Sequence, residues 1–183
     1  MKVKPTGREQ TFDHEEIIVS KTCPAGRITY ANDVFLRVSG YTEAEVLGAP
    51  HSLIRHPDMP RAVFKLLWDT LATGQEIFAY VLNMAKNGDH YWVLAHVTPT
   101  FGANGQIVGY HSNRRTPDRT ALETIAPLYR QMLSEEAKHV SKASQMEHSG
   151  AILHATLGKT GMSYAEFIFS LSDAEGIRIR EAA

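Results

Sequence analysis

The side chains best suited to chemistry in this sequence lie in two short segments, Arg55 to Pro60 and Lys86 to Trp92. The first segment, Arg-His-Pro-Asp-Met-Pro, gathers a guanidinium, an imidazole and a carboxylate in a stretch that its prolines make too rigid for an ordinary helix. The second, Lys-Asn-Gly-Asp-His-Tyr-Trp, has the Asn-Gly pair of a tight hairpin turn that enters an aromatic strand.

Binding is the chemistry that these groups support. Arg55 can pair with a phosphate or with a neighbouring carboxylate such as Asp58. Asn83, shortly before the second segment, can offer both a donor and an acceptor to the polar edge of a flat ligand. No nucleophile, base and orienting group are visible as a catalytic set, so we expect that the protein is not an enzyme.

Metal and nucleotide chemistry find little support in the sequence. The central histidines fall on different segments without the spacing of a metal-ligand pair. Gly158-Lys159-Thr160 resembles the end of a phosphate-binding loop, but Leu153 stands where that loop requires a glycine. The single cysteine, Cys23, excludes an internal disulfide, and its place in the first hairpin argues against light sensing through a cysteine adduct.

The overall composition is that of one globular domain with an appendage. The chain has 183 residues, of which 43% are hydrophobic and 21% charged. A net charge of −1 gives no reason to expect binding to nucleic acid. No apolar run approaches the ~20 residues of a membrane span, and the N-terminus lacks the apolar core of a signal peptide. We therefore expect a cytoplasmic protein without a membrane span.

The elements that must position these groups alternate between short strands and short helices. Two strands form a first hairpin, and Asn32 or Asp33 begins a short helix that Gly40 ends. A longer helix begins at Pro60 and ends at Gly74, and Asn-Gly turns join the last three strands into a meander. This order predicts an α+β fold whose sheet can enclose a pocket. The predicted strands are 17–21, 27–30, 77–85, 91–97 and 106–112, and the shorter helices are 34–38 and 42–45.

After residue 117 the sequence becomes helical. Asp118 is the expected N-cap of a helix that Pro127 should kink or restart. The segment 158–161 breaks the helical pattern, and Ser163 with Glu166 forms a capping box for a last helix. We expect these helices to dock on the sheet, to form a homodimer, or both. Their apolar stripe consists of Leu122, Ile125, Tyr129, Met132 and Val140.

The order of elements and the two polar segments resemble the PAS domain of Aer-type aerotaxis receptors. The resemblance covers about residues 10 to 133, and the specific motifs are Arg55 to Pro60 combined with Lys86 to Trp92. It implies a PAS fold, with a five-stranded antiparallel sheet and a short helical crossover, over residues 10–117. Residues 118–183 would then be a helical extension for docking or dimerisation.

The resemblance also implies FAD, held non-covalently between the sheet and the helical crossover. An isoalloxazine needs an apolar slot and a few convergent polar groups. Phe78 and Tyr80 stand where the family carries other residues, and their bulk bears on how much of the pocket stays open. The slot expected from the sequence consists of Tyr30, Phe35, Leu67, Val93 and Val97. The candidate cofactor-binding residues are Asn32, Arg55, His56, Asp58, Phe64, Asn83 and Trp92.

Alternatives remain open for several of these groups. His56 contacts the flavin or fixes the Pro57-Asp58 turn, and Arg55 binds the cofactor or forms a structural ion pair with Asp58. Haem is a second possible cofactor, with His51 or His56 as the axial ligand.

Three functions are therefore in view. The first is a redox or oxygen sensor that signals to a partner such as a receptor, a kinase or a chemotaxis component. The others are a cofactor-free PAS module for interaction or dimerisation, and a haem-based gas sensor.

Overall fold

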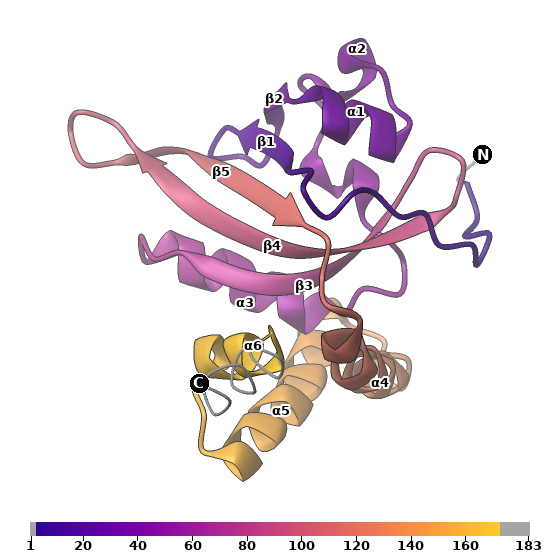
Figure 1. Ribbon diagram of the computed structural model, residues 1–183. Coiled ribbons are helices and arrows are strands. Elements are labelled where there is room, and N and C mark those ends of the chain that lie inside the picture. Colours follow the sequence, from indigo (N-terminus) through magenta and orange to yellow (C-terminus); the bar gives the residue numbers. More distant parts are fainter. Residues whose placement is uncertain (1–2, 173–183) are drawn as a thin grey trace, which may run out of the picture. The chain divides into compact units, whose positions relative to one another are not determined.

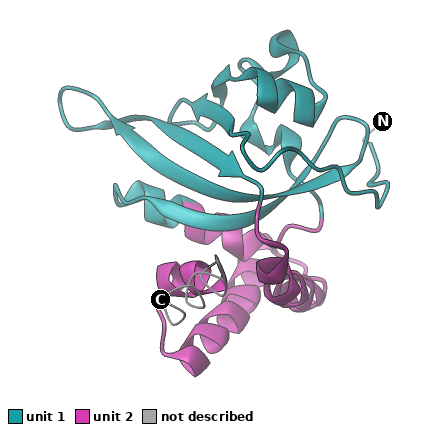
Figure 2. Cartoon of the chain, viewed as in Figure 1, with its two compact units in different colours: residues 1–57, 68–116 teal, residues 58–67, 117–183 magenta. Residues whose placement is uncertain are grey.

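A computed structural model describes residues 3–172 of the chain. These residues divide into two compact units, residues 3–57 with 68–116 and residues 58–67 with 117–172 (Figure 2). The first unit holds the sheet, and the second holds the start of α3 and the C-terminal helices. The elements are β1 (Ile18–Thr22), β2 (Ile28–Ala31), α1 (Asp33–Ser39), α2 (Glu43–Val46), η1 (His51–Ile54), α3 (Arg61–Ala72), β3 (Ile77–Met84), β4 (His90–Phe101), β5 (Ile107–Arg115), α4 (Arg119–Glu136), α5 (Lys142–Thr160) and α6 (Tyr164–Ser172).

The first unit is built on a five-stranded antiparallel sheet with the strand order β2-β1-β5-β4-β3. Figure 1 shows α1 and α2 gathered on one side of this sheet. The hairpin signals were correct, because the turn at Asn87-Gly88 joins β3 to β4 and the turn at Asn104-Gly105 joins β4 to β5. The predicted α+β fold is confirmed.

Strand register decides which side chains share one side of the sheet. Ser20 pairs with Ser112, Ser112 with Val97, and Val97 with Ile77, and partners in an antiparallel pair point to the same side. Along β1, β3, β4 and β5, alternate residues point to this side, and most of them are buried. We call this side of the sheet the inner face. The inner face consists of Ile18, Ser20 and Thr22 of β1, Ile77, Ala79, Val81 and Asn83 of β3, Tyr91, Val93, Ala95 and Val97 of β4, and Ser112 and Arg114 of β5.

The short helices begin and end where the capping residues predict. The Asn32 side chain accepts a hydrogen bond of 3.0 Å from the Phe35 backbone N–H at the start of α1. Gly40 ends that helix in the left-handed conformation, with φ at 71°. Thr42 and Glu45 form the capping box of α2, so capping residues account for the start of both helices and the end of α1.

The N-terminal segment runs along the turn between β3 and β4. Asp89 accepts hydrogen bonds from the Thr6 hydroxyl at 2.5 Å and from Arg8 at 3.0 Å. These two contacts lower the pKa of the Asp89 carboxyl below its ordinary value. Gly88 has φ at 93°, and a Cβ there would lie 2.4 Å from the Lys4 carbonyl oxygen, so only glycine fits this approach.

The helix α4 corrects two expectations about the C-terminal region. It runs without a break from Arg119 to Glu136, with Pro127 inside it, so the predicted restart at Pro127 is wrong. Val140 follows the helix and is fully exposed, so it does not belong to the apolar stripe. The other members of the stripe are buried, namely Leu122, Ile125, Tyr129 and Met132.

Glu136 joins three parts of the second unit. Its carboxylate is buried and accepts hydrogen bonds from the backbone N–H of Arg61 at 2.7 Å and from the Ser149 hydroxyl at 2.9 Å. The backbone N–H of Ala62 lies 3.4 Å from the same oxygen. The last residue of α4 therefore caps the N-terminus of α3, where backbone N–H groups lack partners within the helix.

The last two helices follow their predicted caps with one adjustment. The helix α5 includes residues 158–160, and only Gly161 ends it, with φ at 68°. The predicted capping box of α6 is confirmed, since Ser163 N–H donates to Glu166 Oε2 at 2.7 Å and Glu166 N–H donates to Ser163 Oγ at 3.3 Å. Over residues 3–172, no helix combines the length and the apolar character needed to cross a bilayer.

Candidate functional site

A buried polar cluster lies where the inner face meets α1 and η1. Arg114 of β5 is only 3% exposed. Its Nη2 atom donates to Ser20 Oγ at 2.9 Å and lies 2.6 Å from His51 Nε2. The Phe35 ring of α1 lies 5.9 Å from the centre of the guanidinium. The sheet and the crossover thus hold one cation between them.

The protonation states follow from burial. Burial, and secondly the positive charge of Arg114, lower the pKa of the His51 imidazole to about 3. His51 is therefore neutral at physiological pH, and its Nε2 can accept a hydrogen bond from Arg114. Burial also lowers the pKa of Arg114 to about 10, which leaves the guanidinium charged. The pKa of the buried Tyr91 hydroxyl is raised by burial, so that side chain is neutral as well.

Four polar atoms on the inner face are buried without a hydrogen-bond partner among the described residues. They come from three strands, and two of them are N–H donors while the other two are hydroxyl oxygens. Buried polar groups in proteins are nearly always paired, and each one left unpaired costs about 1–3 kcal/mol. Such a group of atoms on one face fits a ligand that carries several acceptors. The atoms are Thr22 Oγ1, Asn83 Nδ2, Ser112 Oγ and Arg114 Nη1.

Two of the residues that sequence analysis selected are brought together. Arg55 and Asn83 pair as a single antiparallel bridge, which joins the polar segment to the strand β3. His56 is 4% exposed, and its ring packs edge-on against the ring of His90 at 6.0 Å between centroids. The two motifs named at the outset therefore meet within the first unit.

Asn32 has a structural role. Its Oδ1 accepts from the backbone N–H groups of Val19 and Phe35, each at 3.0 Å, and its Nδ2 donates to the carbonyl of Ile17 at 2.8 Å. The amide is thus engaged in joining β1 to α1. Asp58 and Phe64 lie in the second unit, where Asp58 is exposed and Phe64 half-buried.

Other selected residues lie away from the inner face. Trp92 pairs in register with Leu82 and lies on the opposite side of the sheet from Asn83. Tyr30 is 46% exposed, so its assignment to the apolar slot is wrong. Phe78 and Tyr80 also belong to the opposite side, where Phe78 stacks on His96 at 4.1 Å. Their bulk therefore leaves the inner face to smaller residues, Ala79 and Val81.

Sequence analysis did not select Arg114, Ser112 and Ser20. Polar residues in a strand ordinarily indicate its solvent side, so nothing in a short alternating pattern marks these as buried. One signal was present in the sequence. Ser112 and Arg114 lie two and four residues after the aromatic Tyr110, so the three side chains point to the same side of β5.

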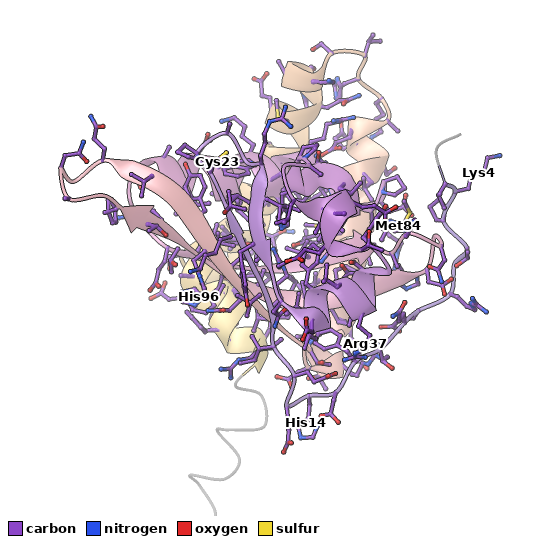
Figure 3. All side chains as sticks on the ribbon, turned by 90° about the horizontal axis from the view of Figure 1, so that it is seen from above. Lys4, His14, Cys23, Arg37, Met84 and His96 are labelled. Atoms are coloured by element: carbon purple, nitrogen blue, oxygen red, sulfur yellow. The ribbon has the colours of Figure 1, made fainter. Side chains whose placement is uncertain are left out.

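Cys23 lies in the turn after β1, at the opposite end of the sheet from Lys4 and Met84 (Figure 3).

The fold and the buried cluster between sheet and crossover define a PAS domain, and residues 28–114 match the family model of the PAS fold. The chain is 40% identical over 143 residues to the aerotaxis receptor of Escherichia coli K12. This alignment covers 78% of the chain and 27% of the receptor. The chain thus contains a PAS domain of the aerotaxis-receptor type, and it spans about a quarter of the length of that relative.

Further relatives and structures are similar over the same region. The nitrogen fixation regulatory protein of Klebsiella pneumoniae is 29% identical over 56% of this chain and 21% of its own length. The blue-light photoreceptor Aureochrome1 LOV superimposes with a TM-score of 0.53 at 23% identity, covering 62% of this chain and 90% of that one. A light-oxygen-voltage domain from work on a flavin analogue gives a TM-score of 0.54 at 21% identity, covering 63% and 86%. These structures share the fold.

Proposed function

We propose that this chain is a PAS sensor of redox state or oxygen that holds FAD non-covalently and signals to a partner protein. The observation that carries the proposal is the set of buried, unpartnered polar atoms on the inner face. Support also comes from the similarity to the aerotaxis receptor and to a light-oxygen-voltage domain from work on a flavin analogue. When bound, a flavin supplies reversible electron uptake, which side chains do not provide.

The residues of the inner face are suited to the two sides of an isoalloxazine ring. Ile18 and Val93 of the inner face and Phe35 of α1 are fully buried and would offer apolar contact to its flat faces. Asn83 Nδ2 and Ser112 Oγ would donate hydrogen bonds to ring carbonyls or nitrogens. Arg55, next to Asn83 through the backbone bridge, is suited to the phosphates of the dinucleotide.

A route for the signal follows from the same bridge. A change of charge at the ring would alter the hydrogen bonds that the Asn83 amide prefers. Because Asn83 pairs with Arg55, a shift of this side chain would be passed to the segment that leads into α3. The partner would be a receptor, a kinase or a chemotaxis component in the cytoplasm.

Flavin content of the purified protein tests this function. We expect a yellow protein whose absorbance band bleaches with dithionite. Asn83→Ala should lower the flavin content several-fold, because the substitution removes a buried hydrogen-bond donor that would bind the ring. Asn113→Ala is the matched control, since Asn113 lies on β5 but on the opposite side of the sheet and bonds to His111.

Two results would contradict the proposal. A colourless protein that takes up no added FAD would favour a cofactor-free interaction module. A Soret band in the spectrum would favour haem. Equal flavin content in Asn83→Ala and Asn113→Ala would remove the proposed role of Asn83 alone.

A further inference from the structure

The buried guanidinium of Arg114 has no counter-charge among the described residues. Its neighbours are the Ser20 hydroxyl, the neutral His51 ring and the face of the Phe35 ring, and the buried, neutral Tyr91 hydroxyl also interacts with its charge. No carboxylate pairs with it in the part of the chain that the structure describes. A charge taken out of water without a partner of opposite sign is costly, so proteins rarely keep one without a function.

The guanidinium is held so that one side of it is available. Ser20 and His51 both engage Nη2, while Nη1 is buried and unpartnered. Ser112 lies two residues earlier on the same face of β5, and its hydroxyl also lacks a partner among the described residues. Arg114 and Ser112 therefore carry neighbouring unpartnered donors on the inner face, one of them charged.

The matching ligand chemistry is an edge that carries negative charge. Arginine keeps its proton in proteins, so a charged donor at this position cannot be switched off by ordinary changes of pH. In an interior of low dielectric constant, a charge pair is stronger than in water. A neutral ring would accept one hydrogen bond from Nη1, but an anionic ring would also neutralise the buried cation.

We infer that Arg114 is the counter-charge that favours the reduced, negatively charged form of the bound flavin over the oxidised form. This inference rests on the proposed function. Reduction adds two electrons and one proton to the oxidised ring, which leaves one negative charge at mildly alkaline pH. In the test, dithionite supplies both electrons and water supplies the proton. Arg114 takes no part in the transfer and acts by binding one product more tightly.

The midpoint potential of the bound flavin measures this preference. Arg114→Gln should lower the affinity for reduced relative to oxidised flavin by about tenfold or more, which is about 30 mV for a two-electron couple. Arg114→Lys keeps the charge and should retain most of the preference. Arg115→Gln removes the same charge from the next residue of β5, which is exposed, and should leave the potential unchanged.

A second measurement uses the unaltered protein and covers the case in which Arg114→Gln fails to hold flavin. Labelling arginine with nitrogen-15 allows the guanidinium signals to be followed on reduction. The Arg114 signal should move and its N–H exchange should slow, while the Arg115 signal stays in place.

The outcomes separate the two proposals. An unaltered protein without flavin defeats the proposed function. A flavin-loaded Arg114→Gln protein with the potential of the unaltered protein overturns the role of Arg114 and leaves the sensor function in place. Unchanged Arg114 signals on reduction of the unaltered protein overturn it as well.

Discussion

At the scale of single residues, the neutral His51 makes the first unit sensitive to acid. Burial lowers the pKa of His51 to about 3 in the folded chain, whereas an unfolded histidine titrates near 6.5. As the pH falls below that ordinary value, the unfolded chain takes up a proton that the folded chain refuses. The contribution of the neutral His51 to the free energy of unfolding is therefore complete when the pH is above the ordinary pKa. This contribution is lost as the pH falls toward the folded-state pKa of about 3.

Urea unfolding at several pH values checks this effect. Between the two pKa values, His51 should lower the free energy of unfolding by up to about 1.4 kcal/mol per pH unit. His51→Gln should be less stable near neutral pH but should lose less stability on acidification. His14→Gln is the control, because that side chain is 85% exposed. Parallel acid profiles for His51→Gln and the unaltered protein would show that His51 is protonated in the folded state.

Residue identity was easier to predict than residue orientation. Arg55, His56 and Asn83 stand out in sequence because rigid or turn-forming neighbours surround them, and the structure brings Arg55 and Asn83 together. Trp92 was selected as the end of the Lys86 to Trp92 motif, and Tyr30 as part of the apolar slot. Trp92 lies on the side of the sheet opposite the inner face, and Tyr30 is 46% exposed. Residues 79–84 of β3 are buried on both sides of the sheet, so alternation along that strand gives no sign of which side is inner.

At the scale of secondary-structure elements, the cap that Glu136 provides to α3 has a measurable contribution. Glu136→Ala should lower the free energy of unfolding by about 1–3 kcal/mol, because buried donors lose their acceptor. Glu136→Gln retains one acceptor oxygen and should lose less. Thermal or urea unfolding gives the comparison, with the exposed Glu123→Gln on the same helix as control.

Comparison of these variants can also contradict the proposed contribution of the cap to stability. If Glu136→Ala and Glu123→Gln have equal stabilities, the hydrogen bonds from Arg61 and Ser149 add nothing to the folded state. If Glu136→Gln is as destabilised as Glu136→Ala, the negative charge of the carboxylate, rather than the acceptor atom, stabilises the helix N-terminus.

Elements were predictable where the signal is local. Asn32, Gly40, the Thr42 capping box and the Asn-Gly turns act within a few residues, and the structure has helices and hairpins at these positions. The continuity of α4 through Pro127 was not predictable in this way, because tertiary packing outweighs the intrinsic cost of an interior proline. The capping of α3 by Glu136 was also invisible, since it joins residues 75 positions apart.

At the scale of the whole molecule, the helix α3 is divided between the two compact units. Residues 58–67 group with the C-terminal helices, while residues from Trp68 onward group with the sheet. Cooperative units of a protein open together in hydrogen exchange. We expect the amides of residues 61–67 to exchange in step with those of α4 and α5, and the amides of β3 to β5 to form a separate group.

Native-state exchange in low denaturant, read by mass spectrometry of peptides, tests this division. Glu136→Ala should speed exchange in residues 61–67 without changing the sheet. Exchange of the whole of α3 in step with β4 and β5 would mean that the helix belongs to the sheet unit and that the division is wrong.

The cap at the start of α3 also sets an order of assembly on the ribosome. Arg61 leaves the ribosome long before Glu136, and the acceptor for its N–H is synthesised 75 residues later. Domains usually fold from the N-terminus as they emerge. The sheet can therefore form early, whereas the first turn of α3 waits for the end of α4. A chain that ends before Glu136 would leave the N–H groups of Arg61 and Ala62 without their carboxylate acceptor, so its second unit would lack the cap that joins α3 to α4.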